Sequence, residues 1–113
     1  MNTIIIDDEW LIRVELIQLL KKYKKIKVIG EAANVSEAIT IINEAKPDLI
    51  FLDIHMKEQN GFDDLIKSNC NCKIVCLSVF DEKGTENDAD NIVGYLSKPI
   101  NAKKLFDVIN KLN

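Results

Sequence analysis

Five short apolar runs recur along this chain, at residues 4–6, 28–29, 49–52, 74–77 and 93–96. They are rich in isoleucine, valine and leucine, which is typical of strands buried inside a parallel sheet. Most segments between them repeat their apolar residues at spacings of three and four, which predicts amphipathic helices. Strands that alternate with helices form a parallel sheet with right-handed crossovers and helices on both faces. We therefore expect an α/β fold with a doubly wound, five-stranded parallel sheet.

Capping and stop signals mark the ends of the predicted elements. Gly30 is expected to close the second strand. Asn34 followed three residues later by Glu37 is typical of a helix start with reciprocal capping. Pro47 is expected to end that helix, and Asn101 to cap the last helix of the chain. These signals divide the chain at the same places as the apolar runs.

Two connections carry weaker signals. After the third strand we expect a loop up to Asn60 and Gly61, then a short helix that carries Phe62 and Leu65. Segment 82–91, which should hold the fourth helix, contains a glycine and several Asn and Asp residues, with almost nothing apolar. Such residues compete with the helix for backbone hydrogen bonds, so we expect this helix to be short or frayed.

Length and composition favour one soluble domain, residues 1–113, with 47% hydrophobic and 29% charged residues. The net charge of −3 argues against direct nucleic-acid binding, which needs a basic patch. The apolar stretches are shorter than the roughly 18 residues of a membrane span. An odd number of cysteines, 3, without a secretory signal favours reduced thiols and a cytoplasmic location. Cys70 and Cys72 form a C-x-C pair, but without a second ligand pair and with a single histidine in the chain a zinc site is not expected.

Polar side chains follow four of the predicted strands. Asp7 and Asp8 come after the first strand, Asp53 after the third, Ser78 after the fourth and Lys98 after the fifth. The carboxyl ends of parallel strands lie along one edge of the sheet, where ligand sites of open α/β sheets form. We therefore expect these residues to meet in an acidic pocket that contains one lysine.

The chemistry of such a pocket suits phosphoryl transfer. Crowded carboxylates repel one another, and Mg²⁺, which prefers oxygen ligands, relieves that repulsion. Lys98 adds a positive charge, and Asp53 can accept a phosphoryl group covalently. Each residue also has a simpler interpretation: a helix cap for Asp7 or Asp8, a turn for Asp53, a local backbone bond for Ser78, a surface charge for Lys98. Four such coincidences at parallel strand ends are less probable than one site.

The blocks around these residues resemble the signature of response-regulator receiver domains of two-component systems, and the resemblance runs from Thr3 to the last helix. The matching blocks are IIIDDE at 4–9, LDIHM at 52–56 with Gly61, LS at 77–78, and YLSKP at 95–99. The resemblance implies the flavodoxin-like sheet order 2-1-3-4-5, which the alternation alone leaves open.

The resemblance also implies roles for single residues around the phosphoacceptor. Asp53 matches the aspartate that is phosphorylated. Asp8 matches the direct Mg²⁺ ligand, and Asp7 matches the neighbour that holds metal-bound water. His55 stands where a backbone carbonyl completes the metal shell, so its imidazole is not expected to take part.

On the neighbouring strands, Ser78 matches the hydroxyl that contacts the phosphoryl oxygens, and Lys98 matches the lysine that pairs with them. The Lys98–Pro99 peptide bond is expected to be cis. Tyr95 matches the aromatic switch that turns inward when the hydroxyl moves; its alternative is an ordinary half-buried strand aromatic.

Further details suggest a subgroup and some departures. Phe80, the two acidic residues after it and the interval from Ser78 to Lys98 resemble receivers attached to LytTR-type DNA-binding domains. Lys57 occupies a position where proline is usual, and Val79 one where a small residue is common. The polar segment 82–91 departs most, because in the family that helix belongs to the output and dimerisation face.

These observations predict a phosphorylation-dependent signalling switch. It accepts a phosphoryl group on Asp53 from a sensor histidine kinase or phosphotransfer protein. It then controls an output domain or partner, and the expected output is transcription. Such a module catalyses only its own phosphorylation and dephosphorylation. A homodimer is expected through segment 82–91, the fifth strand and the last helix. The alternative is a pseudo-receiver that acts as a constitutive interaction module. A phosphatase with an Asp nucleophile would need an acid where His55 stands, and a nucleotide binder would need a phosphate loop instead of the acidic turn at residues 7–9.

Overall fold

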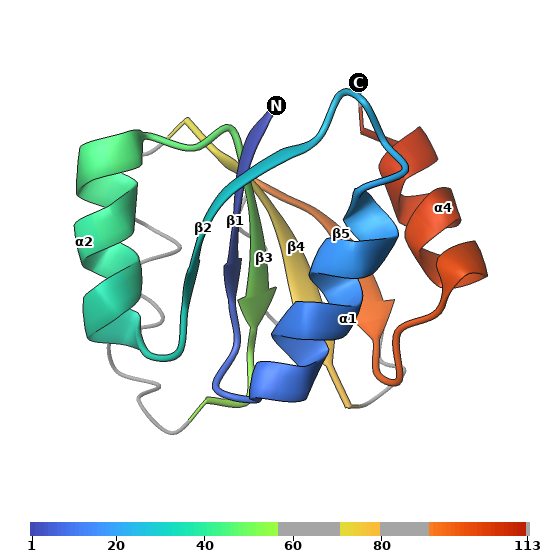
Figure 1. Ribbon diagram of the computed structural model, residues 1–113, viewed down its shortest axis with the longest axis horizontal. Helices are drawn as coiled ribbons and strands as arrows, with labels where there is room; N and C mark the ends of the chain where they lie inside the picture. The colour runs from blue at the N-terminus through green and yellow to red at the C-terminus, as the bar shows by residue number, and fades with distance from the viewer. Residues whose placement is uncertain (57–70, 80–90, 113) are drawn as a thin grey trace.

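The computed structural model describes residues 1–56, 71–79 and 91–112. Its five strands form one parallel sheet of order β2-β1-β3-β4-β5, which confirms the predicted fold class and strand order (Figure 1). The predicted short helix with Phe62 and Leu65 lies outside the described residues, as does segment 82–91 except for Asn91. The described elements are β1 (Asn2–Ile6), α1 (Trp10–Leu20), β2 (Lys27–Ala32), α2 (Val35–Ala45), β3 (Leu49–Asp53), β4 (Lys73–Ser78), β5 (Ile92–Ser97) and α4 (Ala102–Asn110).

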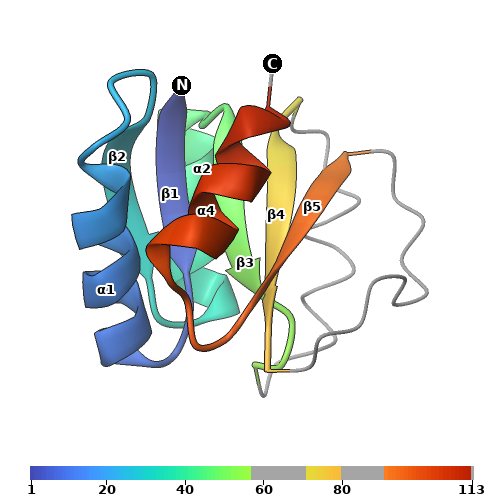
Figure 2. The same ribbon diagram turned by 90° about the vertical axis from the view of Figure 1, so that its right-hand side faces the viewer.

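Helices cover both faces of the sheet. Helix α2 lies against one face, and α1 and α4 lie side by side against the other (Figures 1 and 2). The alternation along β1 explains this division, since Ile4 and Ile6 join the α2 cluster while Ile5 joins the cluster beneath α1 and α4. Every residue of β3 is buried, as expected for the central strand of such a sheet.

Strand β2 extends beyond the glycine that was expected to end it. Gly30 lies inside the strand and pairs with Ile4, and the strand continues to Ala32. A Cβ atom at Gly30 would lie 3.4 Å from Cγ2 of Ile41, a residue of α2. The glycine therefore allows the helix to approach the strand closely, a role that shares its sequence signal with a strand end.

The predicted helix caps are present. Asn34 Oδ1 accepts a hydrogen bond of 2.9 Å from the Glu37 amide, and the Glu37 carboxylate accepts one of 2.9 Å from the Ala33 amide. Asn101 Oδ1 accepts a hydrogen bond of 2.9 Å from the Lys104 amide. These bonds satisfy backbone donors in the first turn of each helix, which otherwise have no partner there.

Two cysteines fall among the described residues. Cys76 is a buried free thiol, and burial raises its pKa to about 12. Cys72 is disulfide-bonded, which differs from the expectation of reduced thiols. In the described part of the chain, the helices are too short and too polar to cross a membrane.

Lys46 adopts a left-handed backbone conformation, with φ 47°, where α2 ends. Side chains with a Cβ are strained there, whereas glycine is favoured at the end of a helix. We expect Lys46→Gly to raise the free energy of unfolding by about 0.5–1 kcal/mol, after allowance for the backbone entropy of glycine. Urea denaturation measures this change.

The matched control is Lys46→Ala, which removes the same charged side chain and keeps the Cβ. Its free energy of unfolding should stay close to that of the wild type. Equal stabilisation by alanine and glycine would show that the side chain, not the backbone, is the source of the effect.

Candidate functional site

Four strand ends deliver polar side chains to the same edge of the sheet, the lower edge in Figure 1. Asp7 follows β1, Asp53 ends β3, Ser78 ends β4 and Lys98 follows β5. Backbone hydrogen bonds fix two of these positions: Asp7 donates to the Ala32 carbonyl at 3.0 Å, and Lys98 donates to the Ser78 carbonyl at 2.7 Å. The parallel register therefore places residues that are distant in sequence at one end of the sheet.

Lys98 is the central cation of this edge. Its Nζ lies 2.8 Å from Asp7 Oδ2, 3.2 Å from Glu9 Oε1 and 3.4 Å from Asp53 Oδ2. The Lys98 side chain is only 7% exposed, so these interactions are poorly screened by water. One ammonium group thus contacts three carboxylates, two from the turn after β1 and one from the end of β3.

The carboxylates themselves form a tight cluster. Oxygens of Asp7, Asp8, Glu9 and Asp53 lie within 4.8 Å of one another, with Asp7 and Asp53 buried and Asp8 and Glu9 exposed. When all four are ionised, their charge exceeds that of Lys98 by three. Such an excess favours the binding of a cation.

The donor set fits a divalent cation that prefers oxygen. Asp7 Oδ2 is buried and has no hydrogen-bond partner among the described residues, although Lys98 lies close enough to form an ion pair. Asp7 Oδ1 accepts from the Glu9 amide at 2.8 Å, and Asp53 Oδ1 accepts from the His55 amide at 2.9 Å. One oxygen of each buried carboxylate is therefore held by the backbone, and the other faces the cluster.

The charges in the pocket shift the pKa values of its members. Burial raises the pKa of Asp7 to about 6, against the lowering effect of the Lys98 ammonium and of the hydrogen bond from the Glu9 amide. For Lys98, burial lowers the pKa, but Asp7, Asp53 and Glu9 together outweigh it and raise the value overall. The buried Asp7 carboxyl thus retains its proton to unusually high pH when no further cation is present.

Ser78 is buried, and its hydroxyl lies 2.9 Å from the imidazole Nε2 of His55. The sequence predicted a role for the backbone of His55 and none for its side chain. The imidazole nevertheless reaches across from the β3 end to the β4 end. It contacts the hydroxyl that the resemblance assigns to the phosphoryl oxygens.

The remaining predicted residues lie on β5 and just after it. Tyr95 is half-buried and packs against the apolar cluster beneath α2, with Cys76 as its partner on β4. The Lys98–Pro99 peptide bond is cis, as the resemblance implies. Val79, which departs from the family pattern, has an exposed side chain.

Sequence reasoning missed two residues of this edge. Glu9 was interpreted only as part of the acidic turn at residues 7–9, yet its carboxylate belongs to the cluster and contacts Lys98. Arg13 donates from Nη1 to the Asp7 carbonyl at 2.6 Å and was not singled out. Its position one helical turn after Glu9 was the available signal, since such a side chain can reach back over the start of the helix.

Comparisons with known proteins give a consistent picture. The family described as "Response regulator receiver domain" matches residues 3–110. An uncharacterized response regulatory protein of Vibrio cholerae is 32% identical over 99% of this chain and 48% of its own length. The sensory transduction protein LytT of Enterococcus faecalis is 34% identical over 98% of this chain and 47% of its own length. The chain thus spans about half the length of these curated relatives.

A solved structure shows the same fold. The response regulatory domain of the protein mrkE from Klebsiella pneumoniae superposes with a TM-score of 0.83 and 22% identity, over 99% of this chain and 94% of that one. At 22% sequence identity this match establishes the fold alone. The assignment to a family rests on the sequence relatives and on the matched family.

The raised pKa of Asp7 predicts a pH-dependent stability. The Asp7 carboxyl holds its proton more tightly in the folded state than in the unfolded state, where its pKa is 3.8. The protonated carboxyl therefore contributes its full stabilising free energy below pH 3.8, and this contribution is lost as the pH rises through about 6. We expect the free energy of unfolding to fall by about 2–3 kcal/mol in the wild type relative to Asp7→Asn across this window. Urea denaturation in EDTA at each pH measures both proteins.

Added Mg²⁺ should reduce this fall, because a cation stabilises the ionised carboxylate. A wild type that instead gains stability relative to Asp7→Asn as the pH rises through the same window would show that Asp7 is ionised in the metal-free protein.

Proposed function

The chain belongs to the response regulator receiver domain family, and on that premise we propose that residues 1–113 form a phosphorylation-dependent signalling domain whose phosphoacceptor is Asp53. The observation that carries this proposal is the position of Asp53: a buried carboxylate, with one oxygen fixed by the His55 amide and the other 3.4 Å from Lys98 Nζ. These two contacts restrain the carboxylate, which supports its assignment as the nucleophile.

In the proposed reaction, an oxygen of Asp53 attacks the phosphorus of a phosphohistidine on a partner kinase or phosphotransfer protein. The phosphorus–nitrogen bond breaks, its electron pair remains on the donor imidazole, and an aspartyl phosphate forms. Lys98 stabilises the negative charge that collects on the transferred group. Because it already contacts Asp53, it needs little reorganisation to do so.

Mg²⁺ would be held by the carboxylates of Asp8 and Asp53 and the backbone carbonyl of His55, with Asp7 holding metal-bound water. When bound, it supplies positive charge to the phosphoryl oxygens and relieves the repulsion within the cluster. The clustering of four carboxylates supports this assignment, as does the burial of Asp7 Oδ2 at that cluster.

Ser78 and Tyr95 are the proposed switch. In the structure, the Ser78 hydroxyl contacts the His55 imidazole. A phosphoryl group on Asp53 offers it stronger, charged acceptors, and the hydroxyl would exchange one partner for the other. Movement at the end of β4 would then give the Tyr95 ring, on the neighbouring β5, room to turn inward.

The output is proposed from the relatives. The relatives named LytT, and the transcriptional regulatory protein BtsR of Salmonella typhi, which is 34% identical, are about twice as long as this chain. We propose that this domain likewise controls a transcriptional output in the cytoplasm, with a sensor histidine kinase as phosphoryl donor. Dimerisation through the β5 and α4 face remains part of this proposal; segment 82–91, which would complete that face, lies almost wholly outside the described residues.

Phosphoryl acceptance is tested directly by incubation with acetyl phosphate and Mg²⁺, followed by intact-mass measurement. We expect the mass of one added phosphoryl group on the wild type and none on Asp53→Asn, since the amide is a far weaker nucleophile. Omission of Mg²⁺ should reduce the labelling strongly.

Asp48→Asn is the matched control, because Asp48 precedes the same strand at its opposite end and accepts a hydrogen bond from Asn2 that an amide oxygen can also accept. It should label like the wild type. Equal labelling of Asp53→Asn and wild type would contradict the proposed acceptor.

The alternative, a pseudo-receiver that acts as a constitutive interaction module, is distinguished by the response of Tyr95. The chain has 2 tyrosines, so fluorotyrosine labelling of a Tyr23→Phe variant reports on Tyr95 alone. We expect its ¹⁹F resonance to shift when beryllofluoride and Mg²⁺ are added, because the ring leaves its half-buried position. An unchanged resonance in a protein that binds Mg²⁺ would favour the constitutive module.

A further inference from the structure

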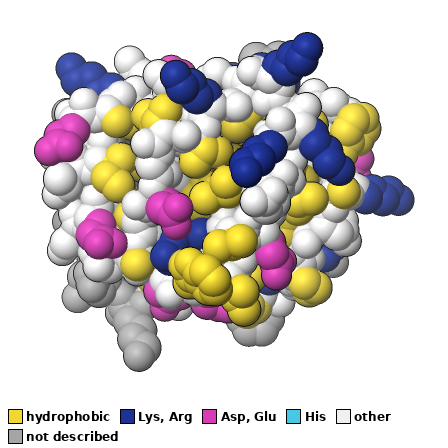
Figure 3. Space-filling model, viewed as in Figure 1, with side chains coloured by type: hydrophobic (Ala, Val, Ile, Leu, Met, Phe, Trp, Pro, Cys, Tyr) yellow, Lys and Arg dark blue, Asp and Glu magenta, His cyan; other side chains and the backbone are white. Residues whose placement is uncertain are grey.

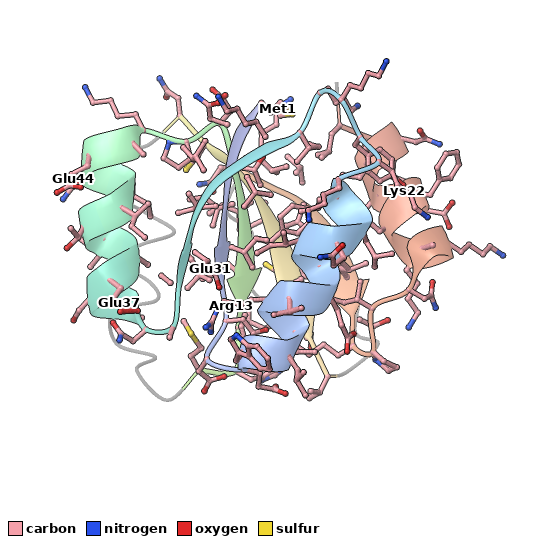
Figure 4. All side chains as sticks on the ribbon, in the orientation of Figure 1. Met1, Arg13, Lys22, Glu31, Glu37 and Glu44 are labelled. Carbon is pink, nitrogen blue, oxygen red and sulfur yellow. The ribbon has the colours of Figure 1, made fainter. Side chains whose placement is uncertain are left out.

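Arg13 connects the acidic pocket to the edge strand of the sheet. It lies in the first part of α1, and Figure 4 shows its side chain close to that of Glu31 on β2. Its Nε donates to Glu31 Oε1 at 2.6 Å, and its Nη1 donates to the Asp7 carbonyl at 2.6 Å. The Arg13 side chain is only 13% exposed, so both bonds are largely shielded from water.

These bonds fix the peptide units on both sides of Asp7. On one side, the Asp7 amide donates to the Ala32 carbonyl at 3.0 Å. On the other, the Asp7 carbonyl accepts from Arg13, which is oriented by Glu31, the residue next to Ala32 on β2. Strand β2 thus holds the residue from which the acidic turn begins, although it contributes no carboxylate to the cluster.

From this arrangement we infer that Arg13 is a positioning residue of the pocket: it holds the turn of Asp7, Asp8 and Glu9 in the shape that lets their carboxylates share one cation. The inference rests on the proposed function, because that cation is the proposed Mg²⁺. The same turn is closed internally by the bond from the Glu9 amide to Asp7 Oδ1, at 2.8 Å. Release of the Asp7 carbonyl would loosen this bond first.

Because Arg13 is positively charged, a positioning role and simple electrostatics predict opposite changes in Mg²⁺ affinity when Arg13 is removed. A guanidinium near a cation site repels the cation, so electrostatics alone predicts that its removal tightens Mg²⁺ binding. Glu31 pairs with the guanidinium and offsets that repulsion, while the guanidinium still donates to the carbonyl. A positioning role therefore predicts the opposite result, weaker Mg²⁺ binding after a positive charge has been removed.

Isothermal titration calorimetry of the whole chain with Mg²⁺ tests the direction of this change in affinity. We expect Arg13→Ala to weaken Mg²⁺ affinity about tenfold, as is usual when a group that orients a metal ligand is lost. Arg13→Lys, whose ammonium is a point charge without the guanidinium fork, should fall between the two. Lys24→Gln, which removes an exposed cation from the connection between α1 and β2, should change the affinity less than twofold.

Amide hydrogen exchange in the metal-free protein is the second measurement. Arg13→Ala should accelerate exchange of the Glu9 amide and leave the Glu37 amide, which is bonded to the Asn34 cap, unchanged. If Arg13→Ala does not fold, Glu31→Ala releases the guanidinium and should accelerate Glu9 exchange in the same way.

The outcomes separate the two proposals. Unchanged or tighter Mg²⁺ binding by Arg13→Ala, with a wild type that binds Mg²⁺, overturns the role of Arg13 and leaves the proposed function standing. A wild type that neither binds Mg²⁺ nor accepts a phosphoryl group refutes the proposed function, and Glu9 exchange then decides by itself whether Arg13 shapes the turn.

Discussion

The buried contact between Lys98 and Asp7, at 2.8 Å, is the interaction on which the site depends. Burial of two opposite charges costs about as much free energy as their attraction returns, so such a pair contributes little to stability. Here the balance is less favourable still, because Asp53 lies near the same ammonium and its carboxylate repels that of Asp7. The fold therefore maintains an excess of negative charge at one edge of the sheet, which a bound cation can relieve.

The rigidity of the surrounding sheet makes this arrangement possible. Leu52 and Leu77 next to the site are completely buried, and β3 is covered on both faces by helices. Carboxylates that repel one another would separate if they were carried by flexible loops. Instead, Asp53 ends a central strand, and Asp7 is held by β2 through its amide and, by way of Arg13, through its carbonyl. Free energy from the apolar core thus offsets the electrostatic cost of the pocket.

The sequence predicted which residues meet but not how they touch. Asp7, Asp53, Ser78 and Lys98 were predictable because the topology of a parallel sheet alone brings strand ends together. The contact of His55 with Ser78 was not, since it depends on the conformation of the turn after β3 and on a side-chain torsion. Glu9 and Arg13 were missed because their contacts with Lys98 and with the Asp7 carbonyl also depend on side-chain torsions.

For the helices and strands too, the sequence predicted what depends on local pattern and missed what depends on packing. Strand positions and helix caps come from local patterns, and the caps at Asn34 and Asn101 were found where their sequence signals lie. Gly30 was misinterpreted as a strand end because glycine marks both turns and close approaches, and only the position of Ile41 distinguishes them. The strand order came from the family resemblance, since alternation of strands and helices is compatible with several orders.

Because Lys98 contacts three carboxylates, its movement could transmit phosphorylation at Asp53 to the rest of the domain. The Lys98 ammonium contacts Asp7, Glu9 and Asp53, so the charge of a phosphoryl group on Asp53 would draw it away from the other two carboxylates. The Lys98 amide is bonded to the Ser78 carbonyl, and Ser78 pairs with Ser97 across β4 and β5. A shift of Lys98 toward Asp53 therefore acts on the two strands that carry the proposed switch residues. In the proposed function, phosphoryl charge on Asp53 and movement of the β4 and β5 backbone would be coupled through this lysine, which contacts all three carboxylates among the described residues.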